Sequence, residues 1–263
     1  MRAVSVHRDA IVVTSLLWQT TATAIRAGGE AMLIDSPYFP EELELLPALL
    51  AQAGFEVNAL LATHGDFDHV LGRLAFPELS LGVAESTMLR LQNKPGEAQR
   101  ELRNRDNESY VTRARPLALG GTQSLPVPGK LELGGEELEL HPAEGHTADG
   151  MAVFAPWLRL LVAGDYLSSV EIPMLSPGGT VAEYRATLAR LAPLVERSET
   201  VVTGHGPPSS RDQALRLLDE DTEYLAALER GEGRPRMPDG RDDAHQRRVH
   251  SDNLAGGAGA AAR

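Results

Sequence analysis

The chain has 263 residues, of which 42% are hydrophobic and 24% charged, and its formal net charge is −12 at pH 7. This composition is typical of a globular protein with enough apolar material for a sizeable core, while the excess of negative charge argues against non-specific binding to nucleic acid. The sequence contains no cysteine, which excludes disulfides, thiolate nucleophiles and cysteine metal ligands.

The apolar runs are short. The run at residues 158–164 (LRLLVAG) cannot cross a bilayer. The N-terminal residues MRAVSVHRDAIVV lack the order of charged, apolar and small residues that marks a signal peptide. We therefore expect a cytoplasmic protein without a membrane partner, and the sequence leaves its oligomeric state open.

The first half of the chain predicts strands interrupted by helices. A helix is expected over residues 40–54, because Pro40 opens it, acidic residues fill its first turn and Gly54 follows its end. A second helix is expected to start within residues 69–76. Strands are predicted by alternation and β-branched content over residues 10–17, 21–29, 30–36 and 58–64.

The second half adds more strands and ends in two amphipathic helices. The helix over residues 180–195 places Tyr184 and Leu188 on one apolar side, and the helix over residues 209–230 has Ser209 or Ser210 as its N-cap. Strands are predicted over residues 129–135, 136–142, 151–165 and 199–206. This order of elements favours a layered α/β architecture.

The tail over residues 231–263 differs in composition from the rest. It is rich in Gly, Pro, Arg and Asp and holds few large apolar residues, so it cannot bury enough surface to offset the entropy lost on ordering. We expect one domain over residues 1–230 and a disordered tail. His245 and His250 are then solvated, and the alternative is a pair of histidines that scavenges metal.

Polar residues of one kind recur after four of the predicted strands. The segments THGDFDH, GHT, GD and GHG each follow an apolar or strand-like run, and glycines beside them allow tight turns. Because ligand sites collect at the carboxyl ends of strands in α/β proteins, these side chains are expected to converge. The candidates are His64, Asp66, Asp68, His69, His146, Asp165 and His205.

These donors suit a metal. Imidazole nitrogen and carboxylate oxygen are ligands for Zn, Mn or Fe, and carboxylates buried together without a cation would be strongly unfavourable. Two divalent ions are the natural compensation. The simpler alternative is that polar residues crowd the loops after strands and that Asp68 only caps the next helix.

At this point the sequence resembles the metallo-β-lactamase-fold hydrolases. Their signature, H-x-H-x-D-H followed by a His, an Asp and a final His, is similar to the four segments here, and the resemblance extends from about Val12 to Tyr224. It implies a four-layer αββα sandwich. It also implies one metal held by His64, residue 66 and His146, a second metal held by Asp68, His69 and His205, and Asp165 bridging both.

Residue 66 departs from that signature, since the family usually has His where this chain has Asp. A carboxylate adds a negative charge and is a harder ligand, which favours Fe or Mn relative to Zn. The similar flavodiiron branch has a Glu here and binds two irons, but this chain has no room for an added flavodoxin domain. Asp66 either ligates directly or binds through water. If it does neither, only the second metal binds.

The chemistry implied is hydrolysis by a water that two metals activate. Asp68 and Asp165 are the expected catalytic residues: Asp68 orients the water and takes its proton, and Asp165 fixes the spacing of the metals. Tyr166 is a candidate substrate-binding residue that could donate a hydrogen bond to a developing oxyanion. Its alternative role is packing beside the strand end.

The segment from Arg90 to Arg115 is basic within an acidic protein. Seven Lys or Arg against four acidic residues give it a net charge of +3. One interpretation is a lid over the site for a small anionic substrate. The other, which we favour, is a solvated helix and loop with mixed charge.

The sequence leaves three alternative functions open. The first is a metal-dependent hydrolase acting on an ester, thioester, lactone or phosphoester bond. The second is a non-haem iron oxygenase acting on a thiol-derived substrate, because His64, His146 and Asp165 alone make a two-His-one-carboxylate set. The third is a non-catalytic scaffold that uses metal structurally. The complete ligand set favours the hydrolase, and nothing in the sequence identifies the substrate.

Overall fold

The computed structural model describes residues 1–231 and 236–260, and of residues 256–260 it describes the backbone alone. A first sheet contains seven strands in sequence order, antiparallel from β1 to β4 and parallel from β4 to β7. Its strands are β1 (Arg2–His7), β2 (Ala10–Thr14), β3 (Thr21–Ala27), β4 (Glu30–Asp35), β5 (Val57–Leu61), β6 (Leu81–Ala84) and β7 (Thr122–Leu125).

A second sheet contains six strands in the order β13-β12-β11-β10-β9-β8. All neighbours in it are antiparallel except β11 and β12, which run parallel. Its strands are β8 (Gly129–Leu133), β9 (Glu136–Pro142), β10 (Met151–Ala155), β11 (Leu160–Val162), β12 (Thr200–Val202) and β13 (Ser209–Ser210).

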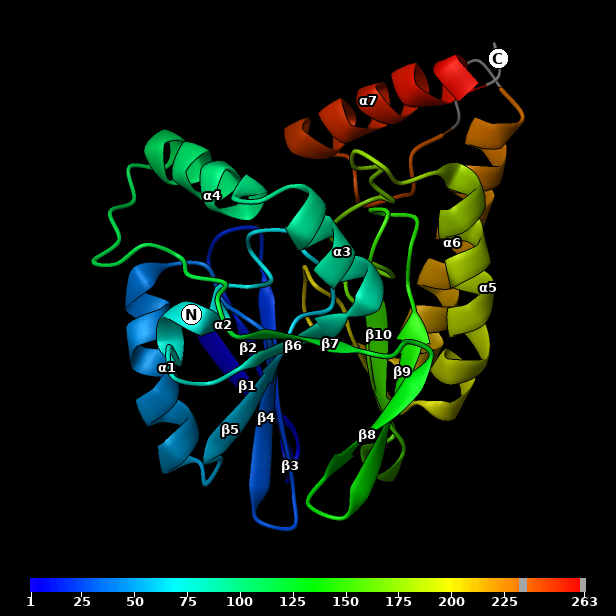
Figure 1. The fold of residues 1–263 in the computed structure, drawn as a ribbon. Helices are drawn as coiled ribbons and strands as arrows, with labels where there is room; N and C mark the ends of the chain where they lie inside the picture. The colour runs from blue at the N-terminus through cyan, green and yellow to red at the C-terminus, as the bar shows by residue number, and fades with distance from the viewer. Residues whose placement is uncertain (232–235, 261–263) are drawn as a thin grey trace.

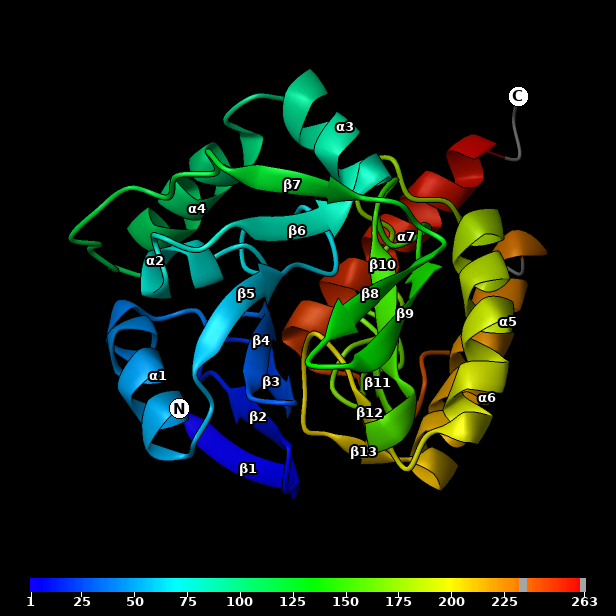
Figure 2. The same cartoon turned by 60° about the horizontal axis from the view of Figure 1, so that its bottom comes forward.

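Helices cover the outer faces of both sheets. In Figures 1 and 2, α1 lies outside the first sheet, while α5 and α6 lie together outside the second. The helices are α1 (Pro40–Gln52), α2 (Gly72–Ala75), α3 (Glu85–Asn93), α4 (Glu97–Glu108), α5 (Val181–Arg197), α6 (Arg211–Glu229) and α7 (Ala244–Ala260), with a 3₁₀ turn at Pro156–Leu158. The expected four-layer αββα sandwich is confirmed.

Alternating strand residues explain the layers. In β10, Met151 and Val153 belong to the core between the two sheets, whereas Ala152 and Phe154 belong to the core beneath α5 and α6. Successive side chains of a strand point to opposite faces, so a strand whose residues are all buried has to be covered on both sides. β10 is buried along its whole length, and a helix layer on the outer face is the consequence.

The expected helices around the sheets are confirmed with one difference. Pro40 lies at the start of α1, and the Ser210 hydroxyl caps α6 by accepting from the Gln213 amide. The helix expected within residues 69–76 is only four residues long and begins at Gly72. Residues 64–71 form turns instead, in which the His69 amide donates to the Asp66 carbonyl, and Asp68 does not cap the helix.

The described part of the tail differs from the disorder expected for residues 231–263, while residues 232–235 and 261–263 of that expectation lie outside the described residues. Helix α7 spans Ala244–Ala260, and Arg241 before it is buried and ion-paired with Asp221 of α6 at 2.7 Å. Polar contacts stabilise this segment: Gln246 and Asn253 accept hydrogen bonds from the amides of residues 172 and 175. Hydropathy did not predict this helix, because its main contacts are polar. Its side chains accept hydrogen bonds from backbone amides of the loop at residues 172–175.

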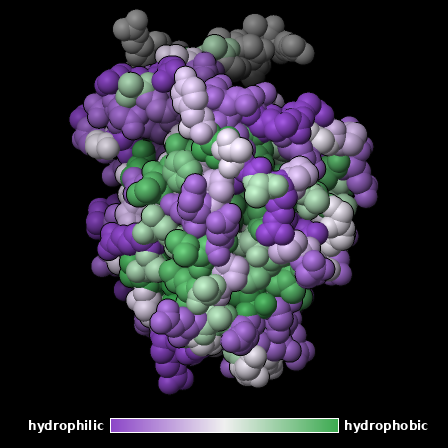
Figure 3. Space-filling model, turned by 90° about the vertical axis from the view of Figure 1, so that its left-hand side faces the viewer, coloured by the Kyte–Doolittle hydropathy of each residue, from purple (hydrophilic) through white to green (hydrophobic). Residues whose placement is uncertain are grey.

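One face of the molecule shows how hydrophobic and hydrophilic residues are distributed over the surface. On the side of the molecule that carries α1, α2 and α4, hydrophobic residues gather across the middle and hydrophilic residues dominate the top (Figure 3). Among the helices described, none has the length and apolar character that a bilayer crossing requires.

Candidate metal centre

Four loops bring the predicted ligands together at one edge of the sandwich. Residues 64–69 follow β5, His146 follows β9, Asp165 follows β11 and His205 follows β12. Each loop leaves the carboxyl end of its strand. An isolated bridge between Thr20 and His205 joins the two sheets beside the cluster. All seven residues expected from the sequence therefore converge.

The ligand atoms fall into two groups of three. The first half-site consists of His64, Asp66 and His146, and the second half-site consists of Asp68, His69 and His205. Within each group the candidate ligand atoms lie within 4.8 Å of one another. Both groups combine two imidazoles with one carboxylate, so each offers the donors of a divalent transition metal.

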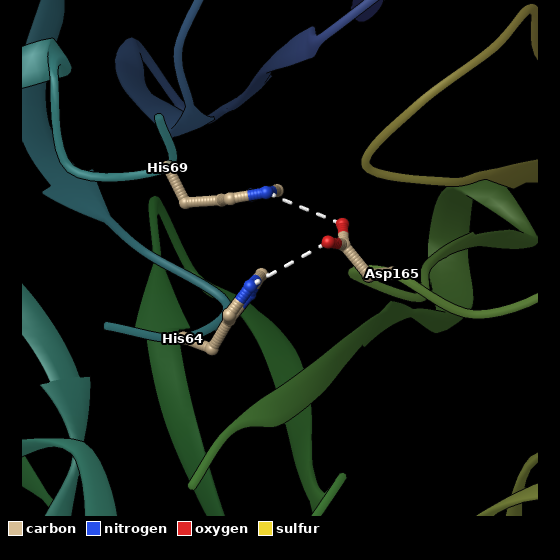
Figure 4. Close-up of side chains that lie close together, drawn as sticks. All are labelled: His64, His69 and Asp165. Carbon is tan, nitrogen blue, oxygen red and sulfur yellow. Dashed lines mark ion pairs between the residues drawn. The ribbon is translucent and has the colours of Figure 1, made fainter. Parts of the chain in front are cut away.

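Asp165 lies between the two half-sites. Its Oδ1 is 3.2 Å from Nε2 of His69, and its Oδ2 is 3.6 Å from Nε2 of His64 (Figure 4). The same Oδ2 lies 3.3 Å from Nε2 of His146 and 3.5 Å from Nε2 of His205. One carboxylate thus faces four imidazoles, two from each half-site, which is the placement that a bridging ligand needs.

A fixed partner at Nδ1 orients each histidine so that Nε2 faces the cluster. Nδ1 of His146 lies 2.8 Å from the Met174 carbonyl, and Nδ1 of His205 lies 3.1 Å from the Trp18 carbonyl. Nδ1 of His64 lies 3.1 Å from the Thr63 hydroxyl. Such contacts hold a ring and its tautomer in place for metal binding.

Asp35 is the partner of the remaining histidine, and the sequence argument did not single it out. Its Oδ2 lies 3.1 Å from Nδ1 of His69, and its carboxylate also accepts hydrogen bonds from the amide and hydroxyl of Thr63. Asp35 ends β4 with a φ of 59°, a left-handed conformation that is uncommon for non-glycine residues. A carboxylate directly after an apolar strand was the signal that could have identified it.

The residues present fit metal ions. Nε2 of His64, His69 and His146 and Oδ1 of Asp165 are buried without a hydrogen bond of good geometry to any described residue. Buried polar atoms are nearly always satisfied, so several unsatisfied atoms aimed at one point fit a bound cation. The donor set is nitrogen and oxygen, which suits Zn, Mn and Fe.

The charges within the cluster are strongly coupled. Burial raises the pKa of Asp165, but His69, His205 and His64 outweigh this and hold that pKa well below its usual range. Burial likewise lowers the pKa of His146, yet Asp66 and Asp165 raise it to about 9. Ions therefore compete with protons for these imidazoles.

Tyr166 lies next to Asp165 but is not placed to contact a substrate. Its side chain is buried, its hydroxyl donates to the Ala143 carbonyl and it accepts from the His146 amide. Both hydrogen-bonding directions of the hydroxyl are thus used within the fold. The expected oxyanion contact is replaced by a structural role in which Tyr166 holds the loop that carries His146.

The basic segment is partly the solvated, mixed-charge face expected from the sequence, since Lys94, Arg100, Arg103 and Arg115 are exposed. Other arginines are held by the fold: Arg113 pairs with Asp106 at 2.8 Å, and Arg90 pairs with Asp66 at 2.7 Å and with Asp149 at 2.9 Å. Arg105 stacks over the ring of Trp18 and pairs with Glu108. Part of the positive charge is therefore neutralised locally, and Arg90 reaches the metal centre itself.

The family profile described as the metallo-β-lactamase superfamily matches residues 16–205, which is more than half of the chain and includes the whole cluster. The chain belongs to the metallo-β-lactamase superfamily.

One curated relative is similar over part of its length. Over 125 residues the chain is 36% identical to coenzyme PQQ synthesis protein B of Xanthomonas axonopodis pv. citri (strain 306). The match covers 42% of this chain and 40% of that protein, so the chain spans about two-fifths of this relative.

Solved structures share the fold. A metallo-β-lactamase family protein from Thermus thermophilus is 19% identical, with a TM-score of 0.66 over 86% of this chain and 82% of that one. The stereoselective inverting sec-alkylsulfatase Pisa1 from Pseudomonas sp. is 15% identical, with a TM-score of 0.68 over 87% of this chain and 42% of that one. A metallo-β-lactamase from Pontibacter korlensis is 18% identical, with a TM-score of 0.60 over 83% and 98%.

Proposed function

We propose that this protein is a metal-dependent hydrolase that holds two divalent ions and cleaves an ester, thioester, lactone or phosphoester bond of a small molecule. The observation that carries the proposal is Asp165, whose carboxylate faces the imidazoles of both half-sites. Two complete donor groups about one shared carboxylate favour a pair of ions over a single ion.

The roles follow from the positions. His64, Asp66 and His146 would hold one ion, Asp68, His69 and His205 the other, and Asp165 would contact both. When bound, two divalent ions lower the pKa of a water molecule and polarise the scissile group. Asp68, whose side chain is 9% exposed and lies 3.5 Å from His205, is placed to orient that water and accept its proton.

Asp66 bears on the identity of the metal. A carboxylate in place of imidazole makes the first half-site harder, which favours iron or manganese over zinc. Elemental analysis of the purified protein beside an Asp66→His variant tests this. A shift towards zinc in the variant supports direct ligation by Asp66, and unchanged metal identity and stoichiometry count against it.

A substrate panel tests the reaction. The metal-free protein, reloaded separately with Zn²⁺, Mn²⁺ or Fe²⁺, is assayed on carboxylic ester, thioester, lactone and phosphodiester substrates. A sulfate ester is added because an alkylsulfatase shares the fold. We expect metal-dependent turnover of at least one class and its loss in Asp68→Asn. Stoichiometric metal without turnover of any class would exclude these bonds as substrates.

The first half-site also supports a second candidate. His64, Asp66 and His146 by themselves form a two-His-one-carboxylate group, as do His64, His146 and Asp165, and this is the arrangement of non-haem iron oxygenases. Oxygen consumption by the iron-loaded protein with thiol-derived substrates separates the two candidates, because a hydrolase consumes none.

A further inference from the structure

Asp66 presents two different faces. Its Oδ1 lies 2.7 Å from Nη1 of Arg90, whereas its Oδ2 lies 3.6 Å from Nε2 of both His64 and His146. One oxygen is thus engaged by a guanidinium and the other faces the imidazoles of the first half-site. A carboxylate held in this way has a defined orientation, although its side chain is 20% exposed.

Arg90 is itself held on more than one side. Its Nη1 also contacts Oδ1 of Asp149 at 2.9 Å, and its Nε contacts Glu97 at 3.2 Å. Only 16% of its side chain is exposed. A guanidinium fixed by several carboxylates loses little further freedom when it orients Asp66.

Asp149 provides a second connection between Arg90 and the loop of residues 64–69, besides the direct contact of Arg90 with Asp66. Its side chain is 1% exposed, and its Oδ2 accepts hydrogen bonds from the Gly65 amide at 2.9 Å and from the Thr87 hydroxyl at 2.8 Å. Helix α3, which packs at β6 and β7 (Figure 1), is therefore joined to the loop both at Gly65 and at Asp66.

A histidine at position 66 would not fit this arrangement. A metal-binding imidazole uses its one lone pair for the ion and presents N–H at its other nitrogen, so it offers Arg90 no acceptor. Arg90 would then face a donor, with the Asp149 carboxylate still attached. Asp66 and Arg90 consequently belong together as a unit that replaces the usual imidazole.

We propose that Arg90 is the positioning residue of the first half-site: it holds Oδ1 of Asp66 so that Oδ2 alone is offered to a divalent ion, and it disfavours histidine at position 66. This inference rests on the metal centre proposed above. It adds a residue from the basic segment to that centre and explains why the departure at position 66 is tolerated.

A double-mutant cycle tests the proposal by metal binding. The wild type, Arg90→Gln, Asp66→His and the double variant are stripped with a chelator, titrated with Zn²⁺ or Mn²⁺, desalted and analysed for bound metal. We expect each single substitution to weaken one of the two binding steps by roughly 10- to 100-fold, as is typical for residues around a metal. In Asp66→His the loss is larger for Mn²⁺ than for Zn²⁺, so its relative preference still shifts towards zinc. We expect the double variant to bind Zn²⁺ at this step more tightly than either single variant.

Matched variants and a fold measurement keep the cycle interpretable. Arg100→Gln removes an exposed arginine of the same segment, one that donates to the Pro95 carbonyl, and it should bind both ions as the wild type does. Thermal unfolding without metal identifies variants that lose the fold. If Arg90→Gln does, Arg90→Lys replaces it. We expect that variant to show a weakened first half-site, because one ammonium cannot replace both Nη1 and Nε and the contact with Glu97 that fixes the side chain is lost.

The outcomes separate the two proposals. Unchanged affinity in a folded Arg90→Gln or Arg90→Lys variant, or additive losses in the double variant, would overturn the role of Arg90 and leave the two-ion hydrolase intact. A wild type that binds no stoichiometric metal would overturn both.

Discussion

The two half-sites have the same number of donors but different supports. The second half-site depends on the ends of the sheets: Asp35 at the end of β4 orients His69, and the Trp18 carbonyl in the connection from β2 to β3 orients His205. The first half-site also depends on segments outside the sheets, namely Arg90 of α3 and the Met174 carbonyl. Its His64 shares the support of β4, because the Thr63 hydroxyl beside it donates to Asp35.

The loop containing Met174 depends in turn on the tail. Arg241 donates to the carbonyls of Ser168 and Glu171, and Asn253 bonds to the backbone of Pro173 and Leu175. The second half-site is therefore supported from the sheets and their connections, whereas the first half-site also relies on α3 and on a loop that the tail holds. Four predictions test this difference.

The largest effect is expected where the half-sites meet. A Cβ at Gly204 would overlap the Asp165 carboxylate and lie 2.7 Å from Cε1 of His69. Because Asp165 faces both half-sites, we expect Gly204→Ala to weaken both metal-binding steps by roughly 100-fold or more. Gly120→Ala is the control, since a Cβ there meets nothing within 4 Å. Wild-type affinity for both ions in Gly204→Ala would contradict the bridging position of Asp165.

Paired substitutions of the supporting carboxylates should separate the half-sites. We expect Asp149→Asn to weaken mainly the first half-site by roughly 10- to 100-fold. We expect Asp35→Asn to weaken the second half-site by a similar factor through its direct contact with His69, and the first half-site less, through Thr63 and His64. Calorimetric titration of the metal-free proteins with Zn²⁺ resolves the two steps. If both variants weaken mainly the same step, the supports are not divided as described.

The tail should affect the first half-site more weakly. Asn253→Ala removes hydrogen bonds to Pro173, Leu175 and the Tyr224 hydroxyl. Loss of such buried bonds costs about 1–3 kcal/mol, so we expect the free energy of unfolding to fall by this amount and metal affinity to fall at the first half-site only. Ser251→Ala, which removes an exposed hydroxyl of the same helix, should change neither. An equal loss at both half-sites would argue against a loop-specific role.

The smallest effect is a difference in pH dependence. Burial lowers the pKa of His205, but Glu171 and Asp165 raise it to about 10, and the pKa of His146 is raised to about 9. Since both lie above the ordinary value of 6.5, they stabilise the metal-free fold fully below pH 6.5, and this stability is lost as the pH rises through 9 and 10. We expect the Tm of the metal-free protein to fall over this range.

Metal affinity should change in the opposite direction. Ions displace these protons, so affinity rises with pH until each histidine is neutral. The gain should extend well above pH 6.5 at both half-sites, because the pKa of His146 in the first and the pKa values of His69 and His205 in the second are all raised. Titrations at several pH values measure this gain. Affinities that fall with increasing pH would contradict the assignment of these histidines as ligands.

The ligands themselves could be predicted because each has a local signal. His146, Asp165 and His205 come after apolar or strand-like runs beside glycines, and the strands that carry them end at one edge of the fold. Asp35 ends an apolar strand in the same way, but no glycine stands beside it in the sequence, so it carried only part of the signal that marked Asp165. Its role depends on the tertiary fold, which places His69 beside Asp35 although the two residues are far apart in the sequence.

The supports of the first half-site could not be predicted from local pattern. Arg90 is one of seven basic residues in a mixed-charge segment, and only the packing of α3 distinguishes it from the others. Helix α7 has a weak signal, since Gln246, Val249 and Asn253 recur at helical spacing and are all buried. Two of these three residues are polar, and a search for apolar faces passes over them.

Helix α7 also affects the timing of assembly during synthesis. All seven ligands have been made once residue 205 has been added, but the loop that orients His146 awaits residues 241–253 for its hydrogen bonds. A ribosome adds roughly 5–20 residues each second, so a few seconds separate the last ligand from the last support. In that interval the second half-site already has its supports, and a nascent chain would take up its first ion there.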